Sequence, residues 1–170
     1  VAIADLRPTQ MTVGLREVEF KRHSWREREG DSASDFLSRH MIPAIKGAKA
    51  RIYIIDHHHL VRALHDEGQQ QVFVNIIADI SWLPASAFWT VCEHRNWAHP
   101  YDDNGRRCST DMMPKKIEDL KDDPYRSLAG ELRRVGGFAK DVTPYSEFLW
   151  ADFLRRNIRR KLVETNFEKA

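Results

Sequence analysis

Short apolar runs in the first half of the chain are rich in β-branched and aromatic residues, which is typical of buried strands. The clearest run spans residues 71–79, and two shorter runs at 42–49 and 51–55 lie around Gly47. The pattern therefore predicts a small β-sheet in this half of the chain.

The strand predicted at 51–55 runs directly into a predicted helix. Apolar residues from Leu60 to Leu64 recur at helical spacing, and Asp56 precedes them. Aspartate is a favoured N-cap residue. We therefore predict a helix that Asp56 caps and that begins with His57, His58 and His59.

Helical patterns account for most of the remaining chain. Residues 15–28 mix acidic and basic side chains in the manner of a solvated helix. Ser32 or Ser34 could cap a helix that ends before Pro43. Further helices are predicted at 86–97, from residue 115 onward with Pro124 at a helix start and Gly136–Gly137 at its end, and from Thr143 through one long last helix. That last helix carries an apolar stripe of Trp150, Leu154, Ile158 and Leu162.

The order of these elements indicates an α/β fold. We expect a small mixed-sheet core over residues 1–110 and a helical extension over 111–170 that packs on it as one structural unit. A chain of 170 residues suits one domain with a real core.

Composition narrows the classes of partner and compartment. Apolar residues make up 42% of the chain and charged residues 31%, which is typical of a globular protein, and the net charge of +2 argues against a dedicated nucleic-acid coat. No apolar run is long enough to span a bilayer. Cys92 and Cys108 do not form a disulfide framework. We expect a cytoplasmic protein, although the chain begins at Val1 and a removed signal peptide stays an open alternative.

The Asp56–His59 turn is the main candidate site. A strand that leads into a helix leaves free N–H groups and the positive end of the helix dipole at the junction, where an anion can bind. Imidazoles there could donate hydrogen bonds or transfer protons near neutral pH. Metal ligation is the alternative, but consecutive helical residues point about 100° apart, so three adjacent histidines cannot share one ion. The plainest alternative is an N-cap followed by surface histidines.

Other candidate groups carry weaker signals. Cys92, His94, His99 and Cys108 could be drawn as a zinc site, but their spacing matches no familiar zinc motif. Glu17 could act as a general base, and Arg106 and Arg107 could clamp a phosphate. The last helix could contact nucleic acid through Arg155, Arg156, Arg159, Arg160 and Lys161.

Several motifs occur in the same order as in a known family. They are Leu6-Arg-Pro-Thr-Gln10, Arg16-Glu-Val18, Ile55-Asp-His-His-His-Leu60, Asp123-Pro-Tyr-Arg-Ser-Leu128 and Glu147-Phe-Leu-Trp-Ala-Asp-Phe-Leu-Arg155. Together they resemble the ParB-like nuclease family, within the ParB/sulfiredoxin superfamily, over nearly the whole chain. The resemblance implies a mixed-sheet α/β domain followed by helices, with a nucleotide or phosphate at the turn that Asp56 to His59 occupies.

The relatives implied by this resemblance have different activities. They include nucleotide-hydrolysing partition proteins, sulfiredoxins and nucleotide-dependent free-serine kinases, whose Asp-Gly-His-His-Arg run binds phosphate. Here His57 and Leu60 replace the glycine and the arginine of that run, and Glu17 is the position to test for the kinases' glutamate base. No cysteine lies in the turn, which argues against sulfinic-acid reduction. The sequence also shows no clear helix-turn-helix motif of the kind with which the partition proteins bind DNA.

We therefore expect phosphoryl-ester chemistry at the turn: phosphodiester cleavage, or hydrolysis or transfer from a nucleotide such as ATP or ADP, with Mg²⁺ neutralising the phosphates. In this scheme the helix N-terminus and His58 stabilise phosphoryl oxygens, His57 or His59 transfers a proton, and Asp56 orients a histidine or a metal. Glu17 and Arg16 approach from the N-terminal segment. The alternatives are a small-molecule (free amino acid) kinase and a non-catalytic DNA-binding module.

Overall fold

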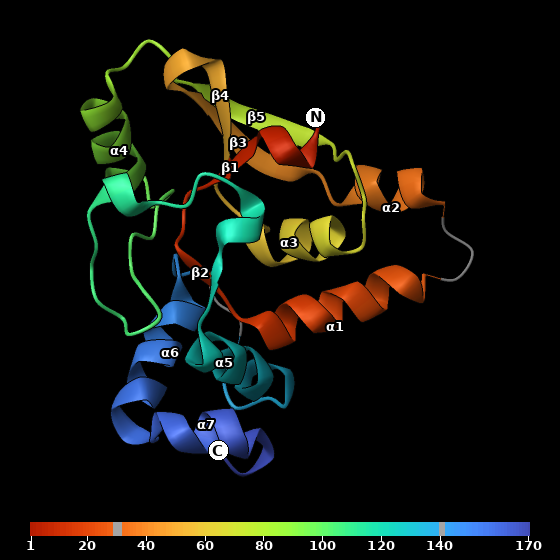
Figure 1. The fold of residues 1–170 in the computed structure, drawn as a ribbon, viewed down its shortest axis with the longest axis vertical. Helices are drawn as coiled ribbons and strands as arrows, with labels where there is room; N and C mark the ends of the chain where they lie inside the picture. The colour runs from red at the N-terminus through yellow and green to blue at the C-terminus, as the bar shows by residue number, and fades with distance from the viewer. Residues whose placement is uncertain (29–31, 140–141) are drawn as a thin grey trace.

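The computed structural model describes residues 1–28, 32–139 and 142–170. Figure 1 shows a sheet with helices near the N-terminus and a group of helices at the opposite end, where the C-terminus lies. The predicted α/β class is confirmed.

Four strands form the main sheet of the described residues, in the order β1-β4-β3-β5. The inner strand β4 (Arg51–Ile54) runs parallel to β1 (Leu6–Pro8) and antiparallel to β3 (Ile42–Gly47). The edge strand β5 (Val74–Asp79) pairs in parallel with β3. The three predicted strands are therefore present. The strand β5 begins later than the apolar run at 71–79 because Val72 donates its N–H to the carbonyl of Val1 and not to β3.

Alternating side chains of the inner strands supply two separate cores. Ala44 and Ile54 belong to the cluster beneath the helices α1 and α3, whereas Ile45 and Tyr53 pack with Phe88 of α4. Successive side chains of a strand point to opposite faces, so two neighbouring strands can serve both layers. Figure 1 shows α4 on one side of the sheet and α3 with α1 on the other.

The first four helices cover these two faces. They are α1 (Leu15–Arg26), α2 (Ala33–Arg39), α3 (His58–Asp66) and α4 (Ala85–His94). Ser32 caps α2 by accepting the N–H of Asp35 at 3.1 Å, which confirms one of its two predicted caps. Because α1 lies along α3, a residue on the inner face of α1 can reach the start of α3.

The helices of the second half pack around α5 (Pro124–Arg134). Pro124 occupies its first turn as predicted, and Asp123 caps it. The prediction of one long last helix is wrong: α6 (Ser146–Asn157) ends and α7 (Arg160–Thr165) begins after a break. Ile158 is extended at this break and its carbonyl accepts the hydroxyl proton of Tyr125 at 2.7 Å, so α7 can turn back and bury Val163 against α5.

Residues from 115 to 122 are also less helical than their pattern suggests. The strand β6 (Lys121–Asp122) pairs in parallel with β2 (Thr12–Val13) and joins the two halves of the fold. Short 3-10 turns complete the described elements at Ile3–Asp5, Ala48–Ala50, Thr110–Met112, Ile117–Asp119 and Phe167–Lys169. The parallel β2–β6 pair fixes where α1 and α5 start, side by side.

Candidate functional site

The turn from β4 into α3 differs from the predicted cap. The helix begins at His58, and its N-cap is His57 with a left-handed backbone (φ 63°). Asp56 lies one residue earlier, and its Oδ1 accepts the N–H of His57 at 2.6 Å. The chain must reverse within three residues after Ile54, and a left-handed residue makes that turn possible. Asp56 is therefore exposed beside the helix N-terminus and does not cap it, which leaves the first-turn N–H groups without a side-chain cap.

The two histidines of the first turn face inward. His58 is 3% exposed, and its Nε2 accepts the N–H of Thr9 at 3.2 Å. His59 is 8% exposed, and its Nε2 accepts the N–H of Gly14 at 3.0 Å. The alternative of surface histidines is thus wrong for both. They hold the segment between β1 and α1 against the start of α3.

These hydrogen bonds determine the protonation state of both rings. A nitrogen that accepts an N–H carries a lone pair, so each neutral ring has its proton on Nδ1. Burial lowers the pKa of His58 to about 3. Burial and the nearby charge of Arg126 lower the pKa of His59 to about 3 as well. Near neutral pH both imidazoles are therefore neutral and can donate only through Nδ1–H, which in His58 is already bonded to the carbonyl of Ile54.

A buried ion pair lies next to His59. Glu17 is 6% exposed, and its Oε2 lies 2.8 Å from the guanidinium of Arg126 and 3.9 Å from Nε2 of His59. Burial raises the pKa of Glu17, but interactions with His59, Arg126 and Lys21 outweigh it and lower the pKa to about 2. Glycine at position 130 makes room for the pair, since a Cβ there would lie 2.8 Å from Oε2 of Glu17.

Arg126 is the site residue that the sequence reasoning missed. It is 6% exposed, and its Nε is buried without a hydrogen-bond partner in the described structure. Its position in the Asp123–Leu128 motif, among the buried residues Tyr125 and Ala129, is the signal that could have identified it. An arginine is rarely buried unless its charge is paired with another group, so a buried arginine indicates a site with a partner or a ligand.

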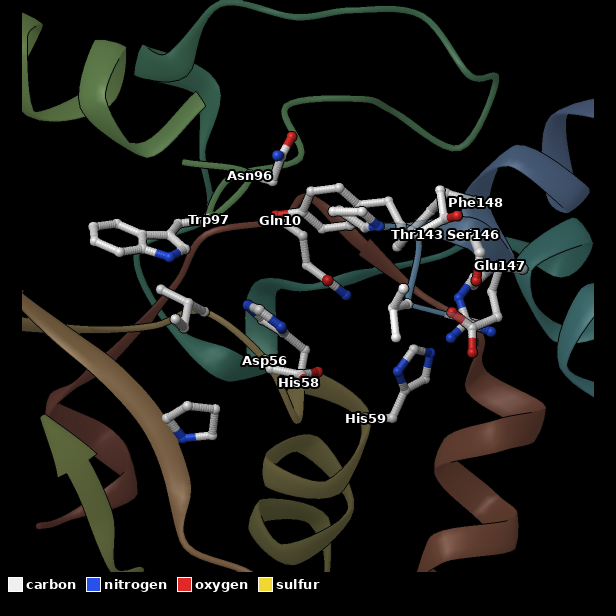
Figure 2. A pocket seen from close by; sticks show the side chains of 16 residues that line it. Gln10, Asp56, His58, His59, Asn96, Trp97, Thr143, Ser146, Glu147 and Phe148 are labelled. Atoms are coloured by element: carbon white, nitrogen blue, oxygen red, sulfur yellow. The ribbon is translucent and has the colours of Figure 1, made fainter. Parts of the chain in front are cut away.

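These groups surround a cleft of about 460 Å³ at the start of α3. Figure 2 shows its side chains, with His58 and His59 on one side and Thr143, Ser146 and Phe148 on another. Residues from β3, α3, α5 and α6 contribute to it, together with Gln10 between β1 and β2. The lining residues include Gln10, Ile55, Asp56, His58, His59, Trp97, Arg126, Tyr145, Glu147 and Phe148. This size and mixed lining suit a small organic ligand.

The structure does not bring every predicted residue to this cleft. Arg16 points away from it, with its guanidinium 4.0 Å from the ring centre of Phe167, and lines a different cleft. The reason is helical geometry, because Arg16 and Glu17 are consecutive and point about 100° apart. His57 lines a smaller polar cleft that adjoins the main one.

The cysteines, histidines and loop residues considered as other candidate sites have structural roles or partners of their own. Within residues 1–28, 32–139 and 142–170, no three His, Cys, Asp or Glu side chains come together to hold a metal ion. Cys92 is a buried residue of α4, and both Cys92 and Cys108 are free thiols. Asp102 shapes its loop by accepting the N–H groups of Asn104 and Arg106, and Arg107 pairs with Glu93.

The arginines of the last predicted helix are partly neutralised. Arg155 pairs with the buried Asp123 at 2.7 Å, and Arg160 pairs with Glu164 at 2.7 Å and with Asp103 at 2.9 Å. The break between α6 and α7 also separates Arg155 from Arg160. In the described part of the chain, no helix is long and apolar enough to cross a membrane.

Comparisons with known proteins agree with this architecture. The chain superposes on the crystal structure of protein Atu1540 from Agrobacterium tumefaciens with a TM-score of 0.90 and 48% sequence identity, over 99% of this chain and 85% of that one. No curated protein matches the chain. A model of the family described as "Putative ParB-like nuclease" matches residues 1–156. The chain therefore belongs to the ParB-like nuclease family.

Proposed function

We propose that the cleft binds the phosphates of a nucleotide at the N-terminus of α3 and that the protein catalyses phosphoryl-ester chemistry there. The observation that carries this proposal is that the first turn of α3 and the buried Arg126 face the same cleft. Free N–H groups of a helix start and an arginine both favour phosphate oxygens. Hydrolysis of a nucleotide, transfer from it and phosphodiester cleavage all use such a cradle.

Each neighbouring group has a role that its environment supports. Arg126 and the Nδ1–H of His59 are donors to phosphoryl oxygens. Glu17 holds Arg126 in place, since a carboxylate with a pKa of about 2 is a poor base at neutral pH. His57, which lines the adjoining smaller cleft, is the candidate for proton transfer, because the Nε2 atoms of His58 and His59 already accept backbone N–H groups.

A divalent cation would fit beside the phosphates. Mg²⁺ is commonly held by one or two carboxylates together with phosphate oxygens. Asp56 and Glu147 line the cleft and could supply these carboxylates. When bound, Mg²⁺ would offset phosphate charge that the protein cations do not match.

The proposed activity can be tested with ATP, ADP and plasmid DNA in the presence of Mg²⁺, by measuring phosphate release and DNA nicking. We expect His57→Ala to lower turnover by about 10²-fold with little change in nucleotide affinity, because general acid–base catalysis contributes roughly that much. His23→Ala removes an exposed histidine of α1 and is the matched control. If wild type and His57→Ala turn over every substrate equally, or if none is turned over, the proposed chemistry is wrong.

A further inference from the structure

A second, smaller cleft adjoins the proposed phosphate cradle, which consists of the first turn of α3 and Arg126. It has a volume of about 280 Å³ and shares Asp56, His59, Arg126 and Glu147 with the main cleft. Its other walls come from α1, α3, α5 and the end of α2. They are formed by Glu17, Lys21, His40, His57, Leu60 and Arg133. Leu60 is the one aliphatic side chain in this lining, so the cleft offers little apolar contact to a nucleobase.

The charged side chains of this smaller cleft include two ion pairs and one half-buried lysine. Glu17 pairs with Arg126 at 2.8 Å, and Glu147 pairs with Arg133 at 2.6 Å. Lys21 also lines the cleft, half-buried, and no ion-pair partner of its ammonium occurs among the residues that the structure describes. After the two pairs are matched, the charges left in the lining are those of the half-buried Lys21 and the exposed Asp56, so Lys21 is the inner group that could bind an anion.

Arg126, which lines both clefts, has an unused donor. The Nε of Arg126 is buried and has no hydrogen-bond partner among the described residues. A buried donor without a partner costs free energy, which an added acceptor would recover. The smaller cleft therefore combines a cation, a free donor and too little volume for a second nucleotide.

We propose that this smaller cleft is a second binding site, for a small oxyanion that lies beside the nucleotide phosphates. The proposal rests on the proposed function of the main cleft. The smaller cleft would recognise the charged oxygens of a phosphate or a carboxylate. The first would be the orthophosphate that hydrolysis releases, and the second would belong to a small molecule that accepts the phosphoryl group.

The test uses protein saturated with the non-hydrolysable nucleotide AMPPNP, into which orthophosphate or acetate is titrated in a calorimeter. Both titrations are repeated without nucleotide. We expect at least one anion to bind the saturated protein, and Lys21→Met to weaken that binding about tenfold through loss of a charge-assisted hydrogen bond. Lys21→Arg keeps the charge and should recover most of the affinity, while Lys115→Met removes an exposed lysine elsewhere and should change nothing.

The titrations distinguish a released phosphate from an acceptor carboxylate, and they separate a failure of the second site from a failure of the proposed function. Binding of phosphate alone assigns the cleft to a leaving phosphate, and binding of acetate alone assigns it to an acceptor carboxylate. Binding of neither anion, or binding that is equal in Lys21→Met, overturns the second site. If AMPPNP itself does not bind, the proposed function fails, while the titrations without nucleotide still decide whether Lys21 holds an anion.

Discussion

Lowering the pH from about 7.5 to about 5 is expected to reduce the free energy of unfolding by about 4 kcal/mol, through His58 and His59 alone. Both have a pKa of about 3 in the folded protein, against an ordinary value of 6.5. A histidine whose pKa is lower in the folded protein takes up a proton more readily in the unfolded chain. Stability therefore falls as the pH drops below 6.5, the pKa of the unfolded chain. Each ring costs about 1.4 kcal/mol per pH unit over that window, until the pH reaches its folded pKa.

The loss should be measured by urea unfolding at several pH values. His99 adds to the slope, because burial and the charges of Arg126 and Arg155 lower its pKa to about 4. His59→Gln removes a titrating group and keeps a side-chain acceptor for the N–H of Gly14, so its pH dependence should be flatter. His23→Gln, at an exposed position, is the control. Equal slopes for wild type and His59→Gln would contradict the assignment of His59 as a buried neutral acceptor.

Replacing Arg126 with alanine is expected to destabilise the fold by about 3–5 kcal/mol near neutral pH, because it leaves the carboxylate of Glu17 buried without its partner. Nucleotide binding should be lost as well, since Arg126 lines the phosphate cradle. Urea unfolding gives the first quantity and titration with AMPPNP gives the second.

A second variant separates these two effects. The double variant Glu17→Gln with Arg126→Met removes both charges, so it should unfold at a free energy closer to that of the wild type than Arg126→Ala does. It should still fail to bind nucleotide. A double variant that is as stable as the wild type and binds nucleotide normally would show that Arg126 has no part in the site.

The strand-to-helix junction could be predicted from the sequence because its signals are local. The β-branched run before Asp56 and the apolar spacing after it lie within a few residues of each other. The same holds for the Ser32 cap and for Pro124 at the start of α5. Local periodicity and capping chemistry act within one or two turns, so a single sequence contains them.

The roles of the histidines could not be predicted, because their partners are distant in the chain. His58 and His59 accept N–H groups from Thr9 and Gly14, more than forty residues earlier. The Glu17–Arg126 pair spans 109 positions. No local signal indicates which distant backbone group each histidine will contact. The family resemblance implies a phosphate at this turn, but it does not indicate the hydrogen bonds that its histidines form.

The break between α6 and α7 has a similar cause. The apolar stripe continues through Ile158 and Leu162, so periodicity favours one helix. The helix ends because Tyr125 of α5 binds the carbonyl of Ile158 and because Val163 finds a buried place against α5. Tertiary packing overrides helical propensity here.

The most direct test of the phosphate cradle is a ¹H–¹⁵N NMR titration of the protein with AMPPNP and Mg²⁺. The backbone amides of His58, His59 and Leu60 belong to the first turn of α3, and the guanidinium of Arg126, which can be followed through its Nε–H signal, lines the same cleft. We predict that these four signals shift together and saturate with one affinity. Shifts confined to α6 and α7, with these four signals unchanged at saturating nucleotide, would contradict the cradle.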